Sequence, residues 1–153
     1  MSRVGVISDT HGLLRPEAMD ALQGCEHIIH AGDIGKQGVI EQLSELAPVT
    51  AVRGNVDQGE LASQYPHDQL LKVEEAFIYT LHILQELDLD PASLGYHAVI
   101  SGHSHKAKIE TVGSVLYLNP GSAGPRRFSL PVTVAVVEIN GSSISPEIVE
   151  LSV

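Results

Sequence analysis

The first third of the chain alternates short strand-like runs with helix-like stretches, and this alternation limits the fold more than any other feature. Residues 4–7, 27–30 and 49–52 are runs of strand length. Pro16 is placed to open a helix after the first run, and residues 39–47 carry apolar side chains at helical spacing before the third. Strand, helix, strand, helix and strand in succession predict a parallel sheet with right-handed crossovers.

Beyond residue 57 the pattern changes. Residues 58–68 are polar and predict a loop with at most one helical turn, and Asp90-Pro91 with Gly95 predicts a short helix at most over 90–95. The remaining strands are expected at 70–73, 76–81, 98–100, 108–112, 115–118, 132–139 and a C-terminal strand that Pro146 places at a sheet edge. The pieces after residue 100 read as antiparallel hairpins, so we expect a parallel half and an antiparallel half.

Length and composition predict one folded domain over residues 1–153. Hydrophobic residues make up 43% and charged residues 18%, which excludes a disordered chain. The single cysteine, Cys25, excludes an intramolecular disulfide and a cysteine-only zinc site. Met1 to Arg3 lead straight into a strand and no apolar run has the length of a membrane span, so we expect a cytoplasmic protein with no membrane contact.

The formal net charge of −10 argues against nucleic acid as a partner, because phosphate backbones are bound by clusters of Lys and Arg. The nine basic residues are scattered, and Arg126-Arg127 is the only adjacent pair. An acidic chain can still bind an anionic substrate where divalent ions reverse the local charge.

Polar side chains follow five of the predicted strands where each strand ends. They are Asp9, His11, Asp33, Asn55, His82, His103 and His105. Because ligands of open α/β sheets bind beyond the carboxyl ends of the strands, we expect these seven side chains to converge on one crevice. Seven ligands are too many for one ion with open catalytic positions, and they fit two divalent ions that share a carboxylate. Mixed imidazole, carboxylate and amide ligands suit Mn, Fe, Zn or Ni, and Mg less well.

The pair His103 and His105 is the strongest part of this set. Side chains two apart in an extended segment point the same way, so both imidazoles can face one ion or two neighbouring ions. The other histidines are expected at the surface or at strand edges (His27, His30, His67 and His97). Asp57 is expected to hold a loop, and residues 119–122 to form a rigid turn near the site.

In their order along the chain, these residues resemble the calcineurin-like metallophosphoesterase superfamily. The matching motifs are Asp-Thr-His at 9–11, Gly-Asp at 32–33, Gly-Asn at 54–55, a histidine at a strand end (His82) and Gly-His-Ser-His at 102–105. Spacing, short length and Asn-Pro-Gly-Ser at 119–122 look like its small bacterial and archaeal phosphodiesterase branch. That branch also includes the phosphoesterase-like subunit of the eukaryotic retromer coat. The resemblance covers nearly the whole chain.

The resemblance implies a four-layer α-β-β-α sandwich of the α/β class and two divalent metal ions, with Mn first among the candidates. Asp9, His11 and His105 would hold one ion, and Asn55, His82 and His103 the other, with Asp33 bridging both. It implies a phosphodiesterase that hydrolyses a small phosphoester with a metal-activated water. Asn55 and Arg126 are the candidates for substrate binding, and a homo-oligomer is possible.

Two positions depart from the family pattern. Val56 replaces the histidine that many members carry after the Gly-Asn pair to protonate the leaving group, so no residue is assigned to that step. Leu81-His82-Ile83 stands where Thr-His-Gly is common, with His67 or His97 as the fallback ligand. Two other functions stay open: a catalytically weak metal-site scaffold that binds partner proteins, and a phosphomonoesterase or nucleotide phosphatase.

Overall fold

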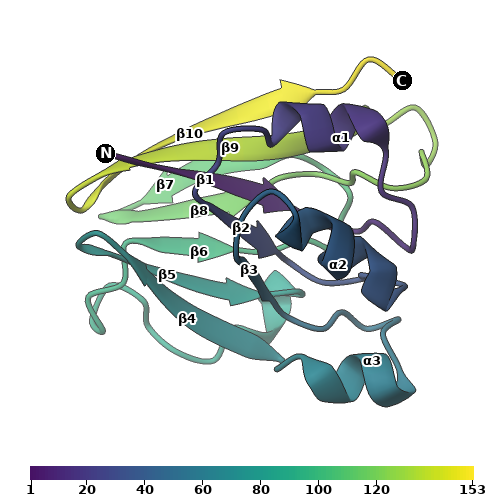
Figure 1. The fold of residues 1–153 in the computed structure, drawn as a ribbon. Coiled ribbons are helices and arrows are strands. Elements are labelled where there is room, and N and C mark those ends of the chain that lie inside the picture. The colour runs from purple at the N-terminus through teal and green to yellow at the C-terminus, as the bar shows by residue number, and fades with distance from the viewer.

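Two five-stranded sheets pack face to face in the computed structural model, which describes residues 1–153 (Figure 1). The strand order of the first sheet is β10-β9-β1-β2-β3. Its strands are β1 (Ser2–Ile7), β2 (His27–His30), β3 (Val49–Ala51), β9 (Thr133–Asn140) and β10 (Ser143–Glu150). The order of the second sheet is β4-β5-β6-β8-β7. Its strands are β4 (Asp68–Val73), β5 (Ala76–Leu81), β6 (Ala98–Ile100), β7 (Lys108–Val112) and β8 (Val115–Asn119).

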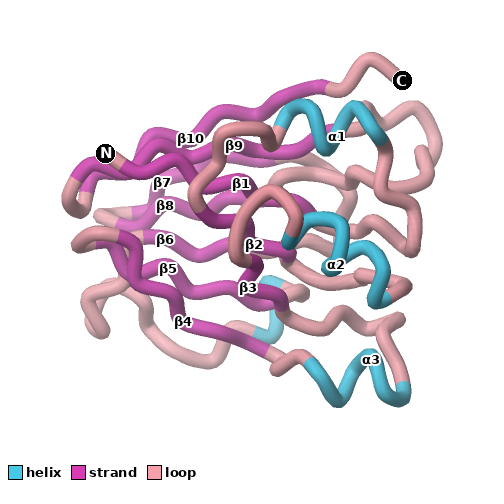
Figure 2. The backbone as a smooth tube through the Cα atoms, viewed as in Figure 1, coloured by secondary structure: helices cyan, strands magenta, loops and turns pink.

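The helices are few and short, as the tube in Figure 2 shows. They are α1 (Pro16–Ala21), α2 (Gln37–Ser44), α3 (Gly59–Gln64) and the 3₁₀ turn η1 (Leu84–Glu86). Pro16 occupies the first position of α1, where its missing N–H costs nothing. No helix has the length and apolar character needed to cross a bilayer.

The predicted parallel arrangement of β1, β2 and β3 is confirmed, since β2 pairs in parallel with both neighbours. The division into a parallel half and an antiparallel half is wrong, because both sheets are mixed. The β9–β10 hairpin pairs antiparallel with β1 and extends the first sheet. In the second sheet β5, β6 and β8 run parallel, and β4 and β7 close the two edges as antiparallel strands. Hairpins thus occupy edges that the parallel strands would leave unpaired.

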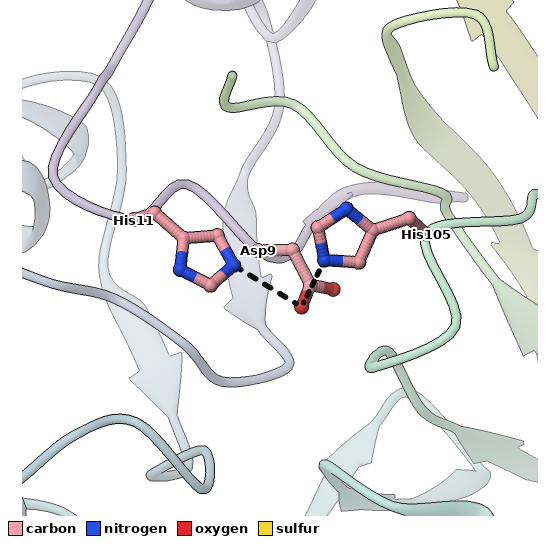
Figure 3. A group of neighbouring side chains, drawn as sticks. All are labelled: Asp9, His11 and His105. Carbon is pink, nitrogen blue, oxygen red and sulfur yellow. Dashed lines mark ion pairs between the residues drawn. The ribbon is translucent and has the colours of Figure 1, made fainter. Parts of the chain in front are cut away.

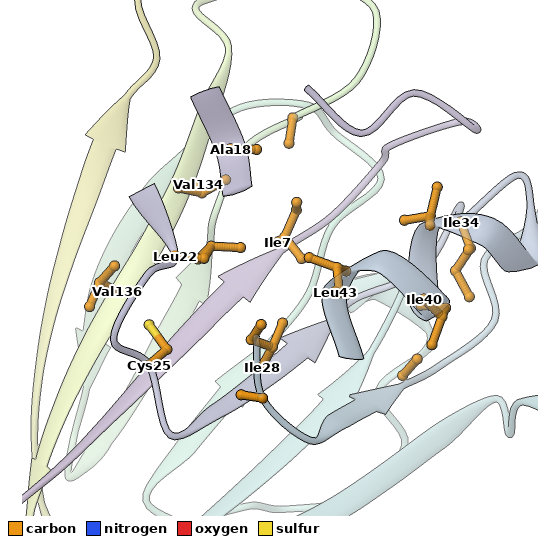
Figure 4. Packing of buried hydrophobic residues seen from close by; sticks show 14 of the residues in the cluster. Ile7, Ala18, Leu22, Cys25, Ile28, Ile34, Ile40, Leu43, Val134 and Val136 are labelled. Carbon is orange, nitrogen blue, oxygen red and sulfur yellow. The ribbon is translucent and has the colours of Figure 1, made fainter. Parts of the chain in front are cut away.

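Three apolar clusters define the layers and confirm the four-layer α/β sandwich. The largest lies between the first sheet and helices α1 and α2, where Leu22 and Leu43 pack near Ile7 and Ile28 (Figure 4). The second joins the two sheets, with side chains such as Val6 and Ile29 from the first and Ile100 from the second. The third covers the outer face of the second sheet with the segment at residues 84–96. This fourth layer is thin, because its only helical element is η1.

One local prediction differs from the structure and two agree with it. Residues 90–95 form a turn, which agrees with the expectation of a short helix at most, because a single turn of backbone hydrogen bonds does not repay the cost of helix nucleation. Residues 59–64 form the helix α3 inside the stretch expected to be mostly loop. Pro146 does lie on an edge strand, β10, as its missing N–H predicts.

Candidate metal centre

The seven candidate ligands meet where the parallel strands of both sheets end. Asp9 and His11 follow β1, Asp33 follows β2 and Asn55 follows β3. His82 follows β5, and the two remaining histidines, His103 and His105, follow β6. The predicted convergence is therefore seen, but the site lies between two sheets and not in the crevice of one.

The first cluster, called the Asp9 group, consists of Asp9, His11 and His105. Each residue offers a ligand atom, and these atoms all lie within 4.8 Å of one another. The Asp9 Oδ1 atom lies 3.9 Å from Nε2 of His11 and 3.4 Å from Nε2 of His105. Figure 3 shows the two imidazoles on either side of this carboxylate. The arrangement is one carboxylate and two imidazoles aimed at a common point.

The second cluster, called the Asp33 group, consists of Asp33, His82 and His103, whose ligand atoms also lie within 4.8 Å of one another. Asp33 Oδ2 is 3.1 Å from Nε2 of His82. Asn55 lies beside this group, since its Oδ1 is 3.2 Å from Nδ1 of His103. The structure thus divides the seven side chains in the way the family resemblance implies.

Asp33 reaches both clusters. Its Oδ2 lies 3.7 Å from Nε2 of His11 as well as 3.1 Å from His82. The Asp9 carboxylate also faces the Asp33 group, since its Oδ1 lies 3.9 Å from Nε2 of His82. The two groups therefore adjoin, and a carboxylate at position 33 is placed to serve ions in both.

Unpartnered buried atoms test whether metal ions fit here. The buried side-chain atoms without a hydrogen-bond partner are Asp9 Oδ1, His11 Nε2, His82 Nε2 and His105 Nδ1. Buried polar atoms are rarely left unpaired, and a bound ion is one of the recognised reasons. The first three point at neighbouring ligand atoms, and the fourth belongs to a ring whose other nitrogen faces Asp9. The donor set and its unpaired atoms fit divalent ions.

Neighbouring donors orient the two carboxylates. Asp9 Oδ2 accepts hydrogen bonds from the Ser8 hydroxyl at 2.7 Å and from the His103 N–H at 3.1 Å. Asp33 Oδ1 accepts from the Val56 N–H at 3.1 Å. Each carboxylate therefore keeps one oxygen for an ion.

The His82 ring is oriented in the same way. Its Nδ1 lies 2.7 Å from the Ala31 carbonyl oxygen and donates to it. This bond leaves the lone pair of Nε2 free, as metal-binding histidines require.

Asp33 and His82 shift each other's pKa. Burial raises the pKa of Asp33, but the hydrogen bond and charge of His82, with the Val56 N–H, lower it to about 2. Burial lowers the pKa of His82, but the Asp33 carboxylate, which would accept a hydrogen bond from the protonated ring, and the charge of Asp9 outweigh burial and raise that pKa. The Asp33 carboxyl is therefore ionised at neutral pH, the state a metal ligand needs.

The ligand loops adopt a backbone that side chains normally avoid. Five candidate ligands have positive φ: Asp9 (57°), His11 (48°), Asp33 (57°), His103 (72°) and His105 (64°). Such strain concentrates at functional sites, where the surrounding structure enforces it. His103 and His105 face two neighbouring groups, one of the two arrangements expected, but the backbone that carries them is not the extended segment predicted. Left-handed residues send His105 into the buried Asp9 group and leave His103 exposed in the Asp33 group.

At two motif positions only glycine fits, because candidate ligand side chains pack directly against the backbone. A Cβ at Gly54 would lie 2.0 Å from Asp33 Oδ1, and a Cβ at Gly102 would lie 2.1 Å from Ser8 Oγ and 2.7 Å from Asp9 Oδ2. Either methyl group would displace a ligand carboxylate or the donor that holds it. The glycines of the Gly-Asn and Gly-His-Ser-His motifs therefore make room for the ligands.

Asp57 and Asn119 have the supporting roles that the sequence predicts. The buried Asp57 carboxylate accepts backbone hydrogen bonds from Ile34, Gly35 and Gly54, which ties the loop after β2 to the loop after β3. The Asn119 amide donates to the Gly102 carbonyl at 2.9 Å, and its oxygen accepts from Gly121.

His30 has a role that the sequence did not reveal. It was expected at the surface or a strand edge, but it is fully buried, and burial lowers its pKa to about 4. Its Nδ1 accepts from the Gly32 N–H, and its Nε2 donates to the Thr10 hydroxyl, which donates to the Ile34 carbonyl. A neutral imidazole thus joins the loops that carry Asp9 and Asp33. Its position as the last residue of β2 was the only available signal.

Of the remaining residues named from the sequence, one lies in the site and three lie outside it. His82 lies in the site, whereas the fallback residues have other partners: His67 pairs with Glu86, and His97 accepts from the Phe77 N–H. Arg126 is not brought to the ligands, since its guanidinium donates to the Val153 carbonyl at 3.4 Å. Its role in substrate binding stays a prediction.

Comparison with known proteins agrees with this geometry. A family model described as a calcineurin-like phosphoesterase superfamily domain matches residues 2–142. The chain belongs to that superfamily. Its fold is shared by Vps29 of Chaetomium thermophilum, with a TM-score of 0.79, 15% identity, and coverage of 98% of this chain and 96% of that one.

Among curated proteins, the chain is similar to a probable metallophosphoesterase of Methanothermobacter thermautotrophicus. The two are 35% identical over 95% of this chain and 91% of the relative. A phosphodiesterase of Methanocaldococcus jannaschii is 32% identical over 78% of this chain and 82% of its own length.

Proposed function

We propose that this protein is a dinuclear, metal-dependent phosphodiesterase. The observation that carries the proposal is the pair of ligand groups that Asp33 connects, with buried ligand atoms left unpaired in each. The name of the phosphodiesterase relative from Methanocaldococcus jannaschii supports the choice of a diester.

The chain's residues supply the binding sites. Asp9, His11 and His105 would hold one ion, and His82, His103 and Asn55 the other, with Asp33 shared. Two divalent ions would supply a nucleophile at neutral pH and positive charge for the phosphoryl oxygens. Ser8, Val56 and Ala31 keep the ligands oriented, so little reorganisation is needed when substrate binds.

The leaving group determines which substrates react well. Val56, whose side chain is exposed, stands where many family members have a histidine, and it cannot donate a proton. Esters whose leaving group departs without protonation should therefore react fastest. Manganese is the first candidate ion, with Fe, Zn, Ni and Mg as alternatives, because mixed N and O ligands suit these borderline to hard cations. We also propose a cytoplasmic location and a small phosphoester substrate.

Hydrolysis of bis-p-nitrophenyl phosphate by protein supplied with Mn or Ni tests this function. We expect turnover that chelation abolishes and metal restores. Folded, metal-loaded protein that releases no p-nitrophenol with any divalent ion would contradict the proposal. Faster release from the monoester p-nitrophenyl phosphate would indicate a phosphomonoesterase. A stoichiometric partner protein without turnover would indicate a scaffold.

A further inference from the structure

A cleft of about 420 Å³ lies beside His103 on the outer face of the second sheet. The 102–104 loop forms one wall and Leu84 and Gln85 form another. Tyr117 and Glu110 are paired across β8 and β7, so their side chains share a face of the sheet. The volume is in the range of small-molecule sites. Because His103 belongs to both the cleft and the Asp33 group, a molecule in the cleft is next to the metal centre.

The charged lining of the cleft is net positive, although the protein as a whole is acidic. The chain has four lysines and a net charge of −10, and two of those lysines, Lys106 and Lys108, line this cleft. Lys108 Nζ is 3.1 Å from Glu110 Oε2, so its charge is largely neutralised. Lys106 forms no ion pair with the protein and is free to meet an anion.

The loop that carries Lys106 is held in place. The Lys106 N–H donates to the Ser104 hydroxyl oxygen at 3.2 Å, and the Asn119 amide donates to the same oxygen at 3.1 Å. Lys106 follows His105, a buried member of the Asp9 group, yet its own side chain is exposed at the cleft. An anchored loop therefore presents a free cation within one residue of a candidate ligand.

We propose that this cleft receives one ester arm of the phosphodiester substrate, and that the arm is a nucleotide with a second phosphate. The inference rests on the proposed function and adds the substrate class. Lys106 is the partner for the second phosphate, and the half-buried ring of Tyr117 offers a surface on which a base can stack. Lys106 is thus a specificity residue, distinct from the metal ligands.

A matched pair of chromogenic diesters tests the assignment. Thymidine 5′-(p-nitrophenyl phosphate) and its 3′-phosphorylated form release the same p-nitrophenol and differ only in the second phosphate. We expect the Mn-loaded protein to prefer the 3′-phosphorylated substrate. In Lys106→Gln the ratio of the two kcat/KM values should fall about fivefold, as expected for one ion pair near solvent. Lys106→Glu should lower it further by repulsion.

Lys72→Gln is the matched control, because Lys72 is exposed on β4, the opposite edge of the same sheet, and its variant should keep the wild-type ratio. An unchanged ratio in both Lys106 variants, with diester hydrolysis intact, would overturn the inference and leave the proposed function standing. Absence of hydrolysis of either diester and of bis-p-nitrophenyl phosphate by metal-loaded wild type would overturn both.

Discussion

The Asp9 group and the Asp33 group contain the same ligand types, one aspartate and two histidines each, but differ in how far they are enclosed. Asp9 and His105 are buried and His11 is half-buried, so solvent has little access to the first group. His103 and the neighbouring Asn55 are exposed, so the second group opens to solvent and to the cleft. Ligand type alone therefore does not separate the two sites. Burial does separate them, and the Asp33 group is the one that solvent reaches.

Asp33 is the residue that joins the two groups, so its replacement should have the largest effect. Asp33→Asn should lower kcat/KM for bis-p-nitrophenyl phosphate by more than about a hundredfold. Mutating a residue that merely hydrogen-bonds to a metal ligand already costs about 10–100-fold in metal affinity or activity, and Asp33 is itself a candidate ligand. Steady-state kinetics measure this fall, and metal analysis of the same sample measures how much metal the variant retains. Asp20→Asn, an exposed change on α1, is the control and should keep full activity. Retained turnover in Asp33→Asn would show that the groups work independently.

Metal removal should distinguish the groups by affinity. We expect the enclosed Asp9 group to hold the tighter ion and the open Asp33 group to lose its ion first as chelator is added. Each ion present at 100 times its dissociation constant stabilises the folded state by about 2.7 kcal/mol. Thermal unfolding and metal content followed across a chelator titration should therefore show two steps. Loss of both ions in one step would show that the difference in burial does not produce a difference in metal affinity.

The two motif glycines allow the two groups to be disturbed to different extents. Gly102→Ala crowds Ser8 and Asp9, whereas Gly54→Ala crowds Asp33, and overpacking of this kind costs about 1–3 kcal/mol. We expect Gly102→Ala to lose mainly the tighter ion, and Gly54→Ala, which displaces the shared Asp33, to weaken both ions, the weaker one most. Gly38→Ala within α2 is the control, because its Cβ meets nothing within 4 Å, and it should slightly stabilise the protein. Equal loss of both ions in the two test variants would argue against separate sites.

The smallest expected effect separates the two histidines of the Gly-His-Ser-His motif. His105→Ala removes the imidazole that lies nearest to the buried Asp9 Oδ1, at 3.4 Å, and should lower the free energy of unfolding by about 1–3 kcal/mol. His103→Ala, at an exposed position, should change it by less than about 0.5 kcal/mol. Urea unfolding of both variants in chelator makes the comparison without bound ions. If His103→Ala lowered the free energy of unfolding more than His105→Ala, the Asp33 group and not the Asp9 group would be the more enclosed one.

Local sequence pattern was sufficient for much of this protein. Short apolar runs separated by helical spacing predicted β1, β2 and β3, because side-chain periodicity reports directly on which face is buried. Placement of polar residues directly after those runs predicted the ligands, since strand ends determine where loops begin. His30 escaped this reasoning, because nothing in an isolated histidine indicates whether its two nitrogens will find internal partners.

Local sequence patterns did not predict which strands pair when they lie far apart in the chain. The β9–β10 hairpin joined β1 instead of forming a separate antiparallel half, and β8 paired in parallel with β6. Hairpin turns are local signals, but the choice of which sheet edge a hairpin covers depends on packing across the whole chain.

The sequence by itself determined which residues are the candidate ligands, the parallel strands that carry most of them and the family to which the chain belongs. Only the tertiary structure decided that the candidate ligands come from two sheets, that His105 is enclosed while His103 is exposed, and that a cleft with a free lysine adjoins the exposed one. The physical reason is that ligand type is a property of single residues. Enclosure, strained backbone and shared faces arise only when segments far apart in the chain pack together.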